Sequence, residues 1–142
     1  MARRDLCGGG LGNWPSYRDD GYRMNMINRS SVLRFTEAQA SIPGRAGEHA
    51  VVVLRRGTLD IALSLPVRPT QQTPHAQDEI YVIVRGRGVL IHDGKRDSFE
   101  SGDLLFVAAG CEHQFEDLTD NCALWRVFYG PSGGEVPEQR NP

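Results

Sequence analysis

The stretch TPHAQDEIYVIVRGRG, residues 73–88, joins a histidine to an alternating apolar segment that ends in a Gly-Arg-Gly turn. Alternation with period two is typical of a β-strand that buries one face. If the segment is extended, four side chains share a face: His75, Gln77, Glu79 and Tyr81. A glutamate on an interior face is costly unless it is paired or binds a metal. The pattern therefore indicates a functional site on this strand.

Period-two segments continue on both sides of this strand. Residues 49–67 predict two strands around Arg56-Gly57, and residues 89–99 predict a hairpin in which Asp93-Gly94 suits a type I′ turn. Further strand-like segments, 104–108, 113–118 and 122–130, are separated by glycine turns. Residues 68–76, RPTQQTPHA, are expected to form a proline-rich connection. Many short strands at regular spacing predict an all-β sandwich or barrel.

The chain ends differ from this pattern. We expect residues 1–30 to form an arm, flexible or in contact with a second subunit, because Trp14, Tyr17 and Tyr22 are aromatic residues in a polar segment. The barrel domain is predicted at 31–131 and a disordered tail at 132–142. Thr36 and Gln39 resemble a capping box, which predicts a short helix at about 36–41. The arm favours a homodimer.

Composition limits the class of protein. The 142 residues are 39% hydrophobic and 24% charged, as expected for one soluble domain. The net charge of −2, without a basic block, argues against nucleic acid as a partner. No apolar run approaches the ~20 residues that a membrane helix needs, and the first residues lack a secretory apolar region. Three cysteines without zinc-site spacing predict reduced thiols in a cytoplasmic protein.

A second histidine, His113, follows Gly110 at the start of another strand-like segment. With His75 and Glu79 it completes a set of two imidazoles and one carboxylate, which leaves coordination positions open on a divalent metal ion. Open positions are what a catalytic metal requires. His-xxx-Glu spacing alone is common by chance, so the interpretation depends on the surrounding pattern.

That surrounding pattern resembles the cupin superfamily over about residues 48–130. The first cupin motif is His-x-His, three or four residues, Glu, six residues and Gly; His75, Glu79 and Gly86 fall on its second His, Glu and Gly. The second motif is Gly, five residues, Pro-x-Gly, two residues, His, three residues and Asn. Its positions are taken here by Gly102, Ala108, Gly110, His113 and Asp117. The resemblance implies an antiparallel jelly-roll barrel.

The departures from the motifs bear on the metal. The resemblance implies four ligands, three His and one Glu, but Thr73 stands where the first His is expected. Thr73 is either a non-ligand, which leaves a position for water or substrate, or a residue whose hydroxyl holds a metal-bound water. Gln77 is an additional candidate ligand through its amide oxygen. The implied cofactor is a divalent metal ion: Fe, Zn or Mn.

Other residues have two interpretations each. Tyr81 lines the substrate pocket or is part of the core. Arg126 shares a face with Leu124 and Phe128, where it binds an anionic substrate inside the barrel, or it is an exposed arginine of an edge strand. Cys111 is interpreted as a turn thiol rather than a nucleophile. His49 and His92 are interpreted as surface residues.

The expected function is that of a metal-dependent cupin enzyme acting on a small organic molecule, with His75, Glu79 and His113 as catalytic ligands. An Fe(II) site with open positions suits a dioxygenase. A Zn(II) or Mn(II) site suits an isomerase, cyclase or lyase. The alternative from another class is a cupin that only binds a small ligand.

Overall fold

The computed structural model describes residues 30–67, 70–71 and 74–138. In this part of the chain one short helix, α1 (Phe35–Ala40), precedes nine strands. The strands are β1 (Ala50–Arg56), β2 (Leu59–Ser64), β3 (Thr70–Gln71), β4 (Asp78–Arg85), β5 (Arg87–His92), β6 (Lys95–Glu100), β7 (Leu104–Val107), β8 (His113–Glu116) and β9 (Ala123–Tyr129).

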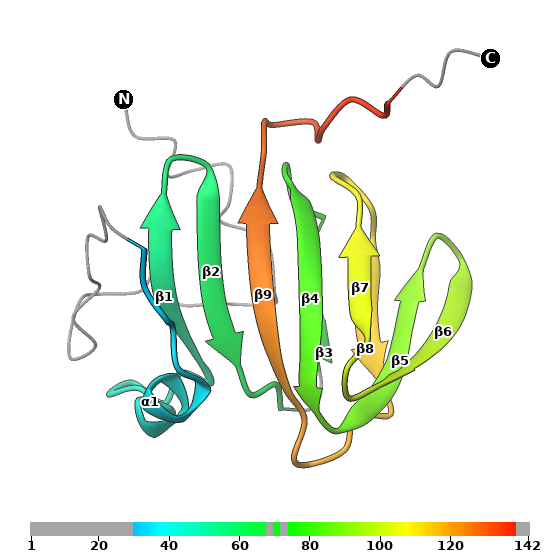
Figure 1. Ribbon diagram of the computed structural model, residues 1–142. Coiled ribbons are helices and arrows are strands. Elements are labelled where there is room, and N and C mark those ends of the chain that lie inside the picture. Colours follow the sequence, from blue (N-terminus) through cyan, green and yellow to red (C-terminus); the bar gives the residue numbers. More distant parts are fainter. Residues whose placement is uncertain (1–29, 68–69, 72–73, 139–142) are drawn as a thin grey trace.

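The strands form two antiparallel sheets, with the orders β1-β2-β9-β4-β7 and β3-β8-β5-β6. Figure 1 shows the five-stranded sheet in front, with β3 and β8 behind it. Consecutive strands β4 and β5, and likewise β7 and β8, belong to different sheets, so the chain crosses repeatedly between the two layers. This arrangement confirms the predicted all-β jelly-roll barrel. Asp93 and Gly94 both have positive φ, as the predicted type I′ hairpin turn requires.

The main core lies between the two sheets. Tyr81 of β4 packs against Phe115 of β8 at 5.0 Å between ring centroids, and Phe99 of β6 lies 5.5 Å from the same Phe115 ring. Ile83 and Leu124 extend this buried cluster along β4 and β9. The core begins at Tyr81, which is the next interior position after Glu79 on β4. The predicted site therefore lies directly next to a packed core.

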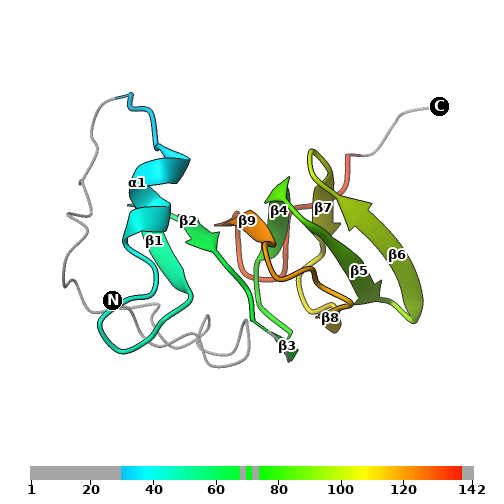
Figure 2. The same ribbon diagram turned by 90° about the horizontal axis from the view of Figure 1, so that it is seen from below.

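The helix α1 covers the outer face of the five-stranded sheet over β1 and β2 (Figure 2). Its Ala38 is fully buried, and Phe35 makes an edge-on contact with Trp125 at 6.4 Å. The predicted capping box does not form, because the helix begins at Phe35 after the N-cap residue Arg34, and Thr36 lies inside it. The helix thus starts without a side-chain cap, at a residue, Phe35, whose ring packs against the sheet.

Two segments outside the long strands differ from what the sequence predicts. The proline-rich segment contains strand β3, which pairs with β8 through the partners Thr70 and Phe115. The predicted disordered tail has an ordered beginning, because Gly133 donates its backbone N–H to the carbonyl of Ala76 at 2.7 Å, and Glu135 donates to the Asp78 carboxylate at 2.8 Å. Neither feature has a local sequence signal, since each depends on partners distant in the chain.

The predicted arm, including Trp14, Tyr17 and Tyr22, lies outside the described residues, and the homodimer stays a prediction. Within the described ranges, no helix combines the length and apolar character needed to cross a membrane.

Candidate metal centre

Three side chains from separate segments converge at one end of the barrel. Nε2 of His75, in the loop before β4, lies 2.6 Å from Oε2 of Glu79 on β4. Nε2 of His113, the first residue of β8, lies 3.3 Å from the same carboxylate oxygen. One donor atom from each residue lies within 4.8 Å of the others, and all three residues are buried. The structure thus brings together the three ligands expected from the sequence.

Backbone carbonyls orient both imidazole rings. Nδ1 of His75 lies 2.6 Å from the carbonyl oxygen of Gln77, and Nδ1 of His113 lies 3.0 Å from that of Cys111. A carbonyl oxygen only accepts, so each Nδ1 carries a proton, and Nε2, which faces Glu79, is the ring atom left to bind a metal. A second hydrogen bond that fixes the tautomer in this way is characteristic of histidines that bind metals.

The charges of the three groups stabilise one another. Burial raises the pKa of Glu79, but the contacts and positive charges of His113 and His75 outweigh it, and the pKa is lowered from its ordinary value. Burial lowers the pKa of His75, but the contact with Glu79 and its negative charge outweigh it, and the pKa is raised. The carboxylate is therefore held in its ionised form, which is the form that binds a cation.

The donor atoms fit a divalent metal ion. Although Nε2 of His75 is close to Glu79, neither that nitrogen nor either carboxylate oxygen has a well-aligned hydrogen bond. Buried polar atoms without such partners are rare and call for a compensating group. Two neutral imidazoles and one carboxylate are suitable ligands for Fe, Zn or Mn. The three residues would hold the ion and leave its remaining positions open.

Two hydrogen bonds lock the segments that carry the ligands. The backbone N–H of Gly110 donates to the carbonyl of His75 at 2.8 Å. The N–H of Ala109 donates to Oδ1 of Asp78 at 3.0 Å. Both join the loop before β8 to the start of β4, so the position of His113 is fixed relative to His75. Asp78 is a buried positioning residue that the sequence interpretation missed, although its signal was a second acid next to Glu79, on the opposite face.

Contrary to the expectation from the sequence, Gln77 does not join the cluster. A bend at Ala76 and Gln77 interrupts the extended backbone, and the strand begins at Asp78. The Gln77 side chain donates Nε2 to the carbonyls of Thr58 and Gly130, at 3.0 and 2.9 Å. The period-two argument that put it on the face of Glu79 fails because that argument holds only for extended backbone. The geometry supports a role of Gln77 in joining the loops at this end of the barrel.

Tyr81 and Arg126 are both on the interior face next to the cluster. The hydroxyl of Tyr81 lies 3.2 Å from Nε2 of His113. Arg126 is paired with Tyr81 across β9 and β4, and only 7% of its surface is exposed. The alternative of an exposed edge arginine is wrong, because β9 lies between β2 and β4 in the sheet.

The remaining candidates are outside the cluster. Thr73 falls outside the described residues, and its role stays a prediction. Cys111 contacts Asp93 through Sγ at 3.2 Å, and burial raises the pKa of its thiol. His92 pairs with Asp97 at 2.6 Å.

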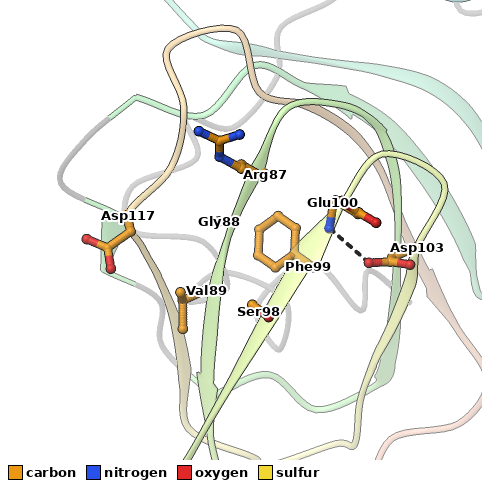
Figure 3. A pocket seen from close by; sticks show the side chains of 8 residues that line it. All are labelled: Arg87, Gly88, Val89, Ser98, Phe99, Glu100, Asp103 and Asp117. Atoms are coloured by element: carbon orange, nitrogen blue, oxygen red, sulfur yellow. Dashed lines mark hydrogen bonds between the residues drawn. The ribbon is translucent and has the colours of Figure 1, made fainter.

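A groove of about 490 Å³ opens at the other end of the β5–β8 pair (Figure 3). It is lined by Gly88 and Phe99 together with charged residues such as Arg87 and Glu100, and by none of the predicted site residues. In the β5–β8 register the partner of His113 is His92, whereas Val89 at the groove pairs with Glu116. The groove therefore lies away from His113, and the buried donor cluster is the stronger candidate for the functional site.

Comparison with known proteins decides the family. The family model described as a cupin domain matches residues 66–129, which include every predicted site residue. An uncharacterized protein of Streptomyces coelicolor is 33% identical over 102 residues, which cover 70% of this chain and 96% of that protein. This chain belongs to the cupin superfamily.

Other relatives of this cupin carry a more specific name. An acireductone dioxygenase of Bacillus cereus is 28% identical over 131 residues, covering 87% of this chain and 76% of that enzyme. Among solved structures, a cupin 2 conserved barrel domain protein from Salinispora arenicola matches with a TM-score of 0.55. Its sequence identity is 19%, and the match covers 72% of this chain and 91% of that one, so it supports the fold alone.

Proposed function

We propose that this cupin is a metal-dependent enzyme that performs dioxygenase-type chemistry on a small organic molecule. The observation that carries the proposal is the convergence of Nε2 of His75, Nε2 of His113 and the Glu79 carboxylate in a buried site. Structural metal sites are closed by four protein ligands, whereas catalytic sites keep positions open. Three protein ligands among the described residues favour the catalytic kind.

Each residue of the site would have a distinct role. His75, Glu79 and His113 would hold the ion, and the two backbone carbonyls would keep the imidazole rings in place. A bound Fe(II) would supply redox chemistry with O2, which side chains lack. Tyr81 would place its hydroxyl at the edge of the site, 3.2 Å from Nε2 of His113. The packed core below the site would exclude water.

The relatives favour oxidation over the other chemistries. Proteins named acireductone dioxygenase match most of this chain, and an acireductone is therefore the first substrate to test. A Zn(II)- or Mn(II)-dependent isomerase, cyclase or lyase would use the same ligands to polarise a carbonyl or an enolate. A cupin that only binds a small ligand is the alternative outside the enzymes.

The test combines metal analysis with O2 consumption. Protein purified without added metal is analysed for Fe, Zn and Mn, then loaded with Fe(II) and mixed with an acireductone in an oxygen electrode. We expect near-stoichiometric metal in the wild type, most of it lost in His75→Ala and His113→Ala. His49→Ala is the matched control, because this histidine is exposed ahead of β1 and far in sequence from both motifs.

Each outcome has a defined meaning. Stoichiometric metal retained in both His75→Ala and His113→Ala would refute the metal centre. Full metal content with conversion of a substrate but no O2 consumption would favour the isomerase, cyclase or lyase. Tight binding of an organic ligand without its conversion would favour the binding protein.

A further inference from the structure

Arg126 lies inside the barrel, one interior position along β9 from the level of Glu79. Its neighbours across the sheet are Tyr81 on β4 and Ala62 on β2. The next interior position of β9 is Phe128, which pairs with Glu79. Arg126 leans toward that position, because its guanidinium lies over the Phe128 ring, with Cζ 4.4 Å from the ring centroid.

The same aromatic ring connects Arg126 to a candidate metal ligand. The centroid of Phe128 lies 4.9 Å from that of the His75 imidazole, in an edge-on contact. The guanidinium of Arg126 and the imidazole of His75 thus contact the same Phe128 ring. A ligand bound at the open side of the metal would therefore have a guanidinium close by.

Arg126 shares an acidic partner with a second arginine. Nη2 of Arg126 pairs with Oδ1 of Asp60, and Oδ2 of the same carboxylate accepts from Nε of Arg55 at 2.9 Å. One carboxylate thus serves two guanidinium groups. The Arg55 side chain is 47% exposed and is solvated, whereas that of Arg126 is 9% exposed. The planar donors of this buried guanidinium, next to the candidate metal centre, suit a carboxylate or enolate oxygen.

From this geometry we infer that Arg126 is the residue that selects the substrate by charge, and that the substrate is a small organic anion. One oxygen of a carboxylate or enolate would be bound by the guanidinium, whose planar donors suit such groups, while other oxygens of the same molecule reach the metal. The inference rests on the proposed function, because it names the substrate class of the same site.

A purely structural role is the competing interpretation. In that case Arg126 and Asp60 form a buried ion pair that joins β9 to β2 and has no effect on ligand choice. The two roles differ in one observable: only a charge-selecting residue changes the preference between an anion and its neutral counterpart of nearly the same shape. Stability alone does not separate them, because both roles predict a loss when the pair is broken.

The experiment compares lactate with lactamide, which differ in charge but hardly in shape. Binding of each to Mn(II)-loaded and to metal-free protein is measured by titration calorimetry. We expect the wild type to prefer lactate by roughly tenfold to a hundredfold, the range of a hydrogen bond to a charged group. Arg126→Met should remove most of this preference. Arg55→Met is the matched control, because it removes the exposed partner of Asp60 and should keep the preference.

The double variant Asp60→Asn, Arg126→Met removes both charges together and replaces the single variant if that one does not fold. Equal binding of the two probes by the wild type, or an unchanged preference in a folded Arg126 variant, would overturn the inference. Failure of the proposed function has a different signature, the absence of bound metal from the wild type. A preference for lactate in metal-free protein that disappears with Arg126 would support the inference even then.

Discussion

The carboxylate of Asp78 accepts a hydrogen bond from the backbone N–H of Ala109, across 31 residues of sequence. Its other oxygen accepts from the N–H of Glu135. Asp78 is buried and directly precedes Glu79, so one side chain ties the strand that bears the carboxylate ligand to the loop that delivers His113. The arrangement of the metal centre thus depends on a residue that does not belong to it.

We predict that Asp78→Ala destabilises the protein by about 1–3 kcal/mol, because two backbone donors lose their acceptor in a largely buried place. It should also weaken metal binding, since the loop before His113 loses its anchor. Urea unfolding and metal titration measure the two effects. Asp103→Ala is the control, because Asp103 makes the same kind of bond, to the N–H of Glu100, at an exposed turn. Equal losses in both variants would contradict the role assigned to Asp78.

Metal should stabilise the folded protein through Glu79. A ligand that binds only the native state at a hundred times its dissociation constant contributes about 2.7 kcal/mol. We therefore expect Mn(II) or Zn(II) to raise the Tm of the wild type, and to leave that of Glu79→Gln unchanged, because the amide has lost the negative charge that attracts the cation. Differential scanning fluorimetry with and without EDTA measures this. A rise of the same size in Glu79→Gln would show that the ion binds elsewhere.

Restoring the family pattern with Thr73→His should tighten metal retention, since a fourth protein ligand is added where the first motif usually has a histidine. Activity should fall in the same variant, because a position for substrate is filled. The rate of metal loss to a chelator and the steady-state rate measure the two effects, and Thr73→Ala is the control for the loss of the hydroxyl. If Thr73→His changes neither quantity, Thr73 does not face the site and the alignment of His75 with the second family histidine is wrong.

Cys111 should react slowly with alkylating agents at neutral pH. Burial and the neighbouring Asp93 raise the pKa of its thiol, so the reactive thiolate forms only at higher pH than in free cysteine. Burial also raises the pKa of Cys122. We expect the alkylation of both to increase with pH along curves displaced to the alkaline side of glutathione, as followed by site-resolved mass spectrometry. Faster alkylation of Cys111 than of glutathione at neutral pH would revive its interpretation as a nucleophile.

The sequence predicted the fold and the convergence of the three candidate ligands because both depend on local periodicity and on motif spacing. Alternation over residues 79–84 corresponds to β4, and alternation in β9 put Arg126 on the face of Leu124 and Phe128, which the structure shows to be the interior. The position of Gln77 was not predictable in this way. Its bend and its hydrogen bond to Gly130 join residues 53 apart in the chain. Asp78 and strand β3 were missed for the same reason, since distant backbone groups define their roles.

The Nδ1 atom of each candidate ligand histidine faces a main-chain carbonyl, that of Gln77 or of Cys111. Every amino acid supplies a carbonyl, so the identity of the residues at positions 77 and 111 has no direct effect on the tautomers. Combinatorial libraries at these two positions should consequently yield many variants that retain their ion. The immediate surroundings of the centre would then be open to redesign while its ligand geometry is inherited unchanged.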